Sequence, residues 1–362
     1  IVFLDSEIIC LYMFFTDQRI APVSYTLNDL KKTLATDDYT YTRNGKTGRI
    51  IFQGTNLFYT VYFTDEKSDR VHRVEIVSDG LLIRKDYFTY GRVFSEYYAP
   101  LDKKAHMYLR RFFNEDGSVA YEEITDNGMV MYQFADRLIC SKEELVGYMV
   151  SRLNLTERDI VLIDRATDIG QIILQNAGPA QVGSIIHADH FSEGGTDDNN
   201  ILWNNYYEYA FSQYKHVDFY VTATETQNRL LREQFRKYVG AEPNVVTIPV
   251  GSLDKLRHPK KVRKKHSLIT ASRLATEKHV DWLIDAVAEA RKQISDLSLD
   301  IYGKGGEEAK LQGQITQKNC GKYIRLCGQQ KLDELYQNYE AYISGSTSEG
   351  YGLSLIEAIG SG

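Results

Sequence analysis

The chain has 362 residues, more than the roughly 100 to 200 of a typical domain, so we expect two or three folded units. Hydrophobic residues make up 43% and charged residues 25%, a globular balance that excludes disorder as the main state. The net charge of -6 argues against nucleic acid or an anionic bilayer as the main partner, because both select for concentrated Lys and Arg.

Cysteine, histidine and hydropathy patterns narrow the class further. The four cysteines are scattered and cannot form a disulfide framework, so a cytoplasmic location is expected. The close pair His187 and His190 lacks a third ligand nearby, so no metal site is predicted. Neither a charge-free stretch of about 18 residues nor a signal peptide is found. The chain starts at Ile1 without a methionine and stops at Gly362 just after a predicted helix start, so we expect both ends to be cut.

The stretch from Tyr39 to Arg137 alternates aromatic or β-branched residues with polar ones. Glycine-containing turn sequences interrupt the alternation, which is typical of strands joined by hairpins. These turns are Asn44-Gly45, Ser78-Asp79-Gly80, Glu115-Asp116-Gly117 and Asp126-Asn127-Gly128. We therefore predict an antiparallel β-meander over residues 39–137, with strands that include 57–63, 81–88, 107–113 and 129–134. Its many tyrosines either pack a thin sheet or line a protein-binding face.

After Cys140 the pattern changes to alternating helices and strands. Ser141 and Glu144 have the spacing of a capping box, which predicts a helix that ends near Leu153. Strands are predicted at 159–164, 182–187, 218–223 and 245–250, and helices at 200–211 and 224–238. This order is typical of a Rossmann-like half, which we place at residues 138–254, with residues 1–38 as a remnant of its beginning.

The basic stretch 255–265 has few apolar residues and is predicted to be an exposed linker. A second α/β half follows at residues 266–362. Its strands are predicted at 267–271, 297–302, 323–326 and 341–344, and its helices at 277–293, 307–319, 332–338 and from about Gly352. The predicted fold class is α/β, with two doubly wound halves and a β-meander insert. A ligand is expected in the crevice between the halves, beyond the carboxyl ends of the strands.

Two cations, Arg273 and Lys278, lie between a buried predicted strand and the helix that follows it. A helix N-terminus carries a positive partial charge, so cations there are disfavoured unless an anion joins them. The planar fork of Arg and the compact charge of Lys suit a diphosphate on which negative charge grows. Alternatively, both are solvated surface cations that Glu277 helps to balance.

The stretch Glu349–Glu357 begins and ends with a carboxylate, follows a predicted strand and enters a helix. Its glycines let the backbone approach a ligand closely, and the helix start near Leu353 and Ser354 presents free N–H groups to a phosphate. Glu349 and Glu357 can accept hydrogen bonds from sugar hydroxyls, as the acidic residue of dinucleotide folds does. Alternatively, Glu349 faces the helix dipole and Glu357 is a surface residue.

Further strand ends supply weaker candidates. Gly303 lies in a glycine-rich turn after strand 297–302 and could border a planar base or a phosphate, although most such turns contain glycine. His187 ends a first-half strand and would face the crevice, although a histidine there is more often a structural hydrogen-bonding residue. Asp164 and Arg165 end the preceding strand and share that ambiguity.

Taken in order, the second-half features resemble the retaining GT-B glycosyltransferases that use nucleotide-activated sugars. The resemblance implies that Arg273 and Lys278 bind the donor diphosphate. It also implies that Glu357 holds the ribose, that Glu349 faces the donor sugar and that Gly303 borders the nucleotide.

Several segments narrow the resemblance to the GtfA family, which starts O-glycosylation of serine-rich repeat adhesins in streptococci and related bacteria. They are His-Ala-Asp-His-Phe-Ser-Glu (187–193), Ile-Leu-Trp-Asn-Asn (201–205), Ile-Pro-Val-Gly-Ser-Leu-Asp (248–254), Thr-Ala-Ser-Arg-Leu-Ala-Thr-Glu-Lys-His (270–279) and the β-meander. This implies UDP-N-acetylglucosamine as donor, Ser and Thr hydroxyls of an unfolded adhesin polypeptide as acceptors, and retention of the α configuration. It further implies a homologous, non-catalytic partner of the GtfB type, which the meander helps to contact, and a cytoplasmic enzyme that can associate peripherally with the inner face of the membrane.

Our mechanistic hypothesis is a transfer without metal or cofactor, in which UDP leaves from the face that the acceptor hydroxyl enters. His187 would hydrogen-bond the sugar or shape the acceptor side, and no side-chain nucleophile is assigned.

Two alternatives stay open: a wall teichoic acid glycosyltransferase acting on a polyol-phosphate polymer, and a GtfB-like subunit that binds the adhesin without catalysis. The family also has an N-terminal strand with a glycine-rich loop and continues beyond the position of Gly362. We therefore expect a fragment, whose activity by itself stays open.

Overall fold

The computed structural model describes residues 8–102, 104–251, 253, 255–259, 261–347 and 349–362. The chain divides into two compact units. The first comprises residues up to Asp159 together with 168–180, and the second comprises 160–167 together with 181–362. Within the described residues, no helix has the length and apolar character needed to cross a membrane.

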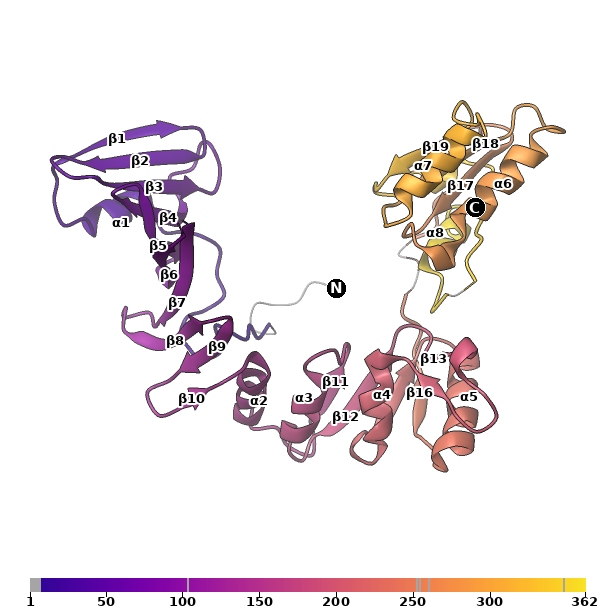
Figure 1. Cartoon of the computed structure of the whole chain (residues 1–362), viewed down its shortest axis with the longest axis horizontal. Helices are drawn as coiled ribbons and strands as arrows, with labels where there is room; N and C mark the ends of the chain where they lie inside the picture. The colour runs from indigo at the N-terminus through magenta and orange to yellow at the C-terminus, as the bar shows by residue number, and fades with distance from the viewer. Residues whose placement is uncertain (1–7, 103, 252, 254, 260, 348) are drawn as a thin grey trace. The chain divides into compact units, whose positions relative to one another are not determined.

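The first unit is built on a ten-stranded antiparallel sheet in which each strand pairs with the next one in the sequence (Figure 1). The strands are β1 (Tyr39–Asn44), β2 (Thr47–Phe52), β3 (Leu57–Phe63), β4 (Val71–Ser78), β5 (Leu81–Phe88), β6 (Arg92–Leu101), β7 (Lys104–Phe113), β8 (Val119–Asp126), β9 (Met129–Gln133) and β10 (Leu138–Ile139). At two predicted turns, Asp79-Gly80 and Asn127-Gly128, both residues have the positive φ that tight hairpins need. The predicted antiparallel meander is therefore confirmed.

The sheet buries one face in its first half and the other face in its second half. Helix α1 (Leu27–Lys32) packs Leu30 into a core with Val61 and Val74. Through the paired residues of β4 to β7, Val74 shares its face with Arg111, so the next residue, Phe112, lies on the opposite face. There Phe112 joins a second core.

Segments before and after the sheet cover this second core. Helix α2 (Lys142–Arg152) contributes Leu145, and residues 11–15 contribute Tyr12 and Phe15. The described part of segment 1–38, predicted as a remnant of a Rossmann-like half, therefore packs on the meander. Many tyrosines of the meander pack its cores, with Tyr121 stacked between Phe112 and Phe134, as the first of the two predicted roles requires.

Helices α2 and α3 (Gly170–Asn176) belong to the first unit, although the sequence places them in the segment 138–254. The capping of α2 follows the prediction in part, because Ser141 Oγ accepts the N–H of Glu144 while Glu144 accepts from Cys140 rather than from Ser141. Helix α3 was not predicted. It packs so closely on α2 that a Cβ at Gly147 would lie 2.7 Å from Ile172.

The second unit contains two four-stranded parallel sheets. The first has the order β11 (Ile160–Ile163), β12 (Gln181–Ile186), β15 (Phe219–Thr222) and β16 (Val245–Thr247). Its helices are α4 (Asn205–Ser212) and α5 (Glu225–Gln234), and α5 continues as a π-helical turn to Val239.

The predicted helix 200–211 begins too early. Residues Leu202–Trp203 form β14, which pairs with β13 (Phe191–Ser192) as a short hairpin. Helix α4 starts only after Asn204, whose side chain accepts the N–H of Tyr206 as an N-cap. Tertiary pairing thus overrides the helical pattern at its first residues.

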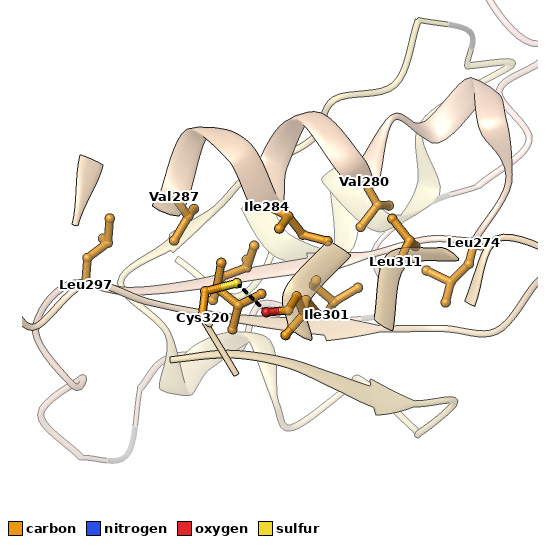
Figure 2. Close-up of a cluster of buried hydrophobic side chains, with 11 residues drawn as sticks. Leu274, Val280, Ile284, Val287, Leu297, Ile301, Leu311 and Cys320 are labelled. Atoms are coloured by element: carbon orange, nitrogen blue, oxygen red, sulfur yellow. Dashed lines mark hydrogen bonds between the residues drawn. The ribbon is translucent and has the colours of Figure 1, made fainter. Parts of the chain in front are cut away.

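The second parallel sheet has the order β19 (Ile324–Gly328), β18 (Ser298–Tyr302), β17 (Ser267–Ala271) and β20 (Ala341–Tyr342). Helices α6 (Val280–Ala290), α7 (Glu308–Gln317) and α8 (Leu353–Ile359) accompany it. Figure 2 shows Val280, Ile284 and Val287 of α6 facing the core, at the spacing of one helix face. Of the predicted helix 332–338 only the 3₁₀ turn Tyr336–Asn338 forms.

Candidate active site

The strand order of the second sheet reverses beside β17, because β18 and β19 follow on one side whereas β20 lies on the other. In doubly wound sheets this switch point opens a crevice at the carboxyl ends of the strands. Arg273 comes directly after β17 and Ser344 after β20, and both line a cavity of about 710 Å³. The topology therefore places a cavity where ligands of such folds bind.

This cavity brings most of the predicted residues together. From the predicted set it is lined by Arg165, His187, Arg273, Lys278, Glu349, Leu353 and Ser354. A neighbouring cavity of about 420 Å³ shares Arg273 and Ser354 with it and is lined by Gly303. Glu357 is not among the lining residues of either cavity; it is exposed on α8 and accepts a hydrogen bond from the Tyr336 hydroxyl (3.3 Å).

Both predicted cations are paired with carboxylates. The guanidinium of Arg273 lies 2.8 Å from Glu277 Oε1 and its side chain is 73% exposed, which agrees with the alternative in which Glu277 balances it. Lys278 is different: its side chain is only 15% exposed, and its Nζ lies 2.9 Å from Oε1 of Glu349, 71 residues further along. A solvated surface cation does not describe Lys278.

Two glycines are required by close backbone contacts. Gly303 has φ +137°, and a Cβ there would lie 1.9 Å from the carbonyl oxygen of Ser272. The loops after β17 and β18 are joined at this point, because Ser272 N–H donates to the Tyr302 carbonyl (3.1 Å). At Gly350 a Cβ would lie 2.2 Å from the carbonyl oxygen of His187. The packing of the cavity walls thus needs both glycines whether or not a ligand binds.

His187 is held at both its ring and its backbone. Its Nε2 lies 2.7 Å from Asp164 Oδ1, because the parallel strands β11 and β12 end side by side. The backbone N–H groups of His187 and Ala188 donate to the Tyr207 hydroxyl at 3.0 and 3.1 Å. His187 is therefore a structural hydrogen-bonding residue that also lines the cavity.

Several lining residues were not predicted. Thr224 and Thr226 follow β15 and line the larger cavity, and Gln329 and Gln330 follow β19 and line the smaller one. Their position within four residues of the end of a parallel strand is the signal that could have found them. In the described part of the chain, no group of three or more His, Cys, Asp or Glu side chains could hold a metal ion.

Comparison with known proteins places the chain in a family. Residues 40–136 match the model of the GtfA extended beta-sheet domain, and residues 254–362 match that of group 1 glycosyl transferases. Over 361 residues the chain is 51% identical to a Streptococcus agalactiae protein named UDP-N-acetylglucosamine–peptide N-acetylglucosaminyltransferase GtfA subunit, covering 99% of this chain and 71% of the relative. The chain belongs to the GtfA family.

Solved structures agree with this assignment. The chain is 45% identical to the pneumococcal O-GlcNAc transferase GtfA, crystallised with UDP and GlcNAc, with a TM-score of 0.86 over 99% of this chain and 71% of that one. It is 48% identical to a chain of a GtfA/B complex, with a TM-score of 0.87 over 99% and 72% of the two chains. The predicted family and the predicted GT-B α/β fold with an antiparallel insert are confirmed.

Proposed function

We propose that the chain binds UDP-N-acetylglucosamine in the two adjoining cavities and transfers N-acetylglucosamine to Ser and Thr hydroxyls of a serine-rich repeat adhesin. The observation that carries this proposal is the meeting of Arg273, Lys278 and Glu349 in one cavity at the switch point of the sheet. The relative from S. agalactiae, whose name states this donor and a peptide acceptor, supports it at 51% identity.

The donor is expected to span both cavities. Because Arg273 and Ser354 line both, the diphosphate would lie near them, with the sugar toward Glu349 and His187 and the nucleoside toward Gly303. Glu357 lies one turn along α8 from Ser354 and would hold the ribose beside its contact with Tyr336.

The ion pair between Lys278 and Glu349 suggests how the site changes on binding. Without donor, the two side chains neutralise each other at 2.9 Å. An arriving diphosphate offers Lys278 a stronger anion, which would release Glu349 to accept hydrogen bonds from the sugar. Arg273 and Lys278 would then stabilise the charge that grows on UDP as it leaves, a role that needs neither a metal nor a side-chain nucleophile.

The site assignment is tested by UDP release from UDP-N-acetylglucosamine with a Ser/Thr-rich peptide, in the full-length protein. Glu349→Gln, Lys278→Ala and Arg273→Ala should each lower turnover by about 10²-fold, since each removes a group that acts on the developing charge or the sugar. Arg229→Ala is a matched control, because Arg229 pairs with Glu233 at the same i,i+4 spacing as Arg273 with Glu277 but on α5. Wild-type-like turnover in Glu349→Gln would refute the assignment.

The acceptor class needs its own experiment. Offering the peptide beside a polyol-phosphate polymer distinguishes protein glycosylation from teichoic acid glycosylation, and donor turnover of any kind excludes a purely binding, GtfB-like subunit.

We further propose that the chain works with a GtfB-like partner in the cytoplasm, peripherally at the membrane. Co-purification and cell fractionation of the tagged protein test both points.

A further inference from the structure

His279, the residue after Lys278, has a backbone conformation that residues other than glycine rarely adopt. Its φ is 42° and its ψ 45°, the left-handed region, where the Cβ of an L-residue crowds the following carbonyl. It occupies the N-cap of α6 without a side-chain cap, and its carbonyl accepts the N–H of Trp282 at 3.1 Å. The strain therefore lies at the junction between Lys278 and the helix.

The ring of Trp282 lies against the imidazole of this strained residue. The two rings stack with centroids 3.7 Å apart and planes 13° apart. Trp282 is nevertheless 54% exposed. It is therefore not a core residue, and the presence of so large an apolar side chain at this turn needs another explanation. A stacked aromatic pair contributes favourably beyond the area it buries, and that is an energy of the size needed to offset backbone strain at one residue.

The same turn determines where Lys278 points. The Lys278 N–H donates to the Ala275 carbonyl at 3.0 Å, and the next peptide leads into the left-handed residue. A Cβ at Gly345 would lie 2.8 Å from the His279 carbonyl and 3.4 Å from that of Lys278, so the loop after β20 packs directly on this turn. From there the Lys278 ammonium reaches Glu349 in the cavity. A relaxed φ at residue 279 would redirect both the turn and the ammonium.

We propose that His279 and Trp282 are positioning residues that, through their stack, fix the turn from which Lys278 reaches the donor diphosphate. The proposal rests on the proposed role of Lys278. Neither side chain acts on the substrate; each acts through the backbone at residue 279.

The test uses glycine, which adopts the left-handed conformation without strain. In the full-length protein, Trp282→Ala should lower UDP affinity and kcat/KM for UDP-N-acetylglucosamine about tenfold. This is the effect expected when the backbone strain at residue 279 is no longer offset by the stack. The double variant His279→Gly/Trp282→Ala should recover to within about twofold of His279→Gly, because glycine makes the stack unnecessary. His266, also left-handed with φ 54°, supplies the control: His266→Gly should not rescue Trp282→Ala.

A double variant as impaired as Trp282→Ala, or an unaffected Trp282→Ala, would overturn the proposal. Lys278→Ala separates this failure from failure of the proposed function, because wild-type-like turnover in that variant refutes the donor role of Lys278 alone. A second readout, the thermal unfolding midpoint, can be measured without donor for the wild type, the two single variants at 279 and 282, and the double variant. These midpoints should show the same rescue by glycine, and additive midpoints would count against the stack.

Discussion

Gly303 combines a backbone conformation and a neighbour that together exclude a side chain. Its φ of +137° is accessible to glycine, and an added Cβ would meet the Ser272 carbonyl oxygen at 1.9 Å. Gly303→Ala should therefore lower the free energy of unfolding by about 3 kcal/mol and disturb the loop that carries Arg273. Gly306→Ala, three residues along the same loop with nothing within 4 Å of the added Cβ, should be nearly neutral. Equal midpoints of denaturant unfolding in the two variants would contradict this explanation.

His190 gives the fold a dependence on pH. It is buried among aromatic rings with its Nε2 2.7 Å from Gln234 Oε1, and burial lowers the pKa of its imidazole below the usual 6.5. A lowered pKa means that the unfolded chain takes up the proton first, so this contribution to stability is complete above about pH 6.5 and is lost as the pH falls toward the folded-state pKa. The melting temperature of the wild type should fall between pH 7 and 5 more steeply than that of His190→Asn, which cannot titrate. Parallel curves would exclude His190 as the cause.

Among individual residues, the sequence predicted those whose chemistry is unusual for their position. Arg273 and Lys278 stand out because positive charges are disfavoured near a helix N-terminus, and both line the cavity. It did not predict that Lys278 pairs with Glu349, because a contact over 71 residues depends on the packing of the loop after β20. Nor did it identify His279, since a left-handed backbone at a histidine has no sequence signal.

The meander carries a row of alternating charges across its strands. Successive paired positions on β4 to β8 are Glu75, Lys85, Glu96, Arg110 and Glu123. Arg110 bridges its two neighbours, with its nitrogens 2.9 Å from Glu96 and 2.6 Å from Glu123. Burial alone would raise the pKa of Glu96, but its hydrogen bonds, that from Arg110 first, hold this pKa below its usual value. At Glu123 the effect of burial is larger than that of Arg110, so the pKa of Glu123 is raised.

Removal of Arg110 should leave two buried carboxylates without the cation that bridges them. We expect Arg110→Met to lower the free energy of unfolding by about 3 kcal/mol at pH 7. Lys32→Met, which breaks an exposed pair with Asp29, should leave the free energy of unfolding nearly unchanged. The Arg110 deficit should shrink as the pH falls toward 4, because protonation then relieves the two carboxylates, and chemical denaturation at both pH values measures it. A deficit that grows in acid would contradict the charge argument.

Elements with strong local patterns were predicted well, and those fixed by tertiary contacts were not. The alternation and the Gly-containing turns of residues 39–137 gave the meander, and Thr224 caps α5 where that helix was expected. In contrast, β14 replaced the start of a predicted helix because it pairs with β13, a contact that periodicity does not reveal. Helix α3 was missed because its packing on Gly147 of α2, rather than its own pattern, identifies it.

For the whole molecule, the boundary of the first compact unit is decided by what covers the sheet. The family match spans 40–136, yet both cores of the sheet depend on residues outside that range. Leu30 of α1 closes the core on one face, and Phe15 with Leu145 of α2 closes the core on the other. A sheet without these covers would expose both apolar faces to water.

Two fragments test whether the first unit needs these covering segments to fold. Residues 8–153 include both covers and should fold alone, with a cooperative thermal transition by circular dichroism. Residues 39–139 contain all ten strands but lack α1, residues 11–15 and α2, so they should aggregate or unfold without a cooperative transition. A third fragment, residues 8–139, regains α1 and residues 11–15 but not Leu145, and should melt below residues 8–153. If residues 39–139 melted as cooperatively as the longer fragment, the sheet itself rather than its covering segments would hold the unit together.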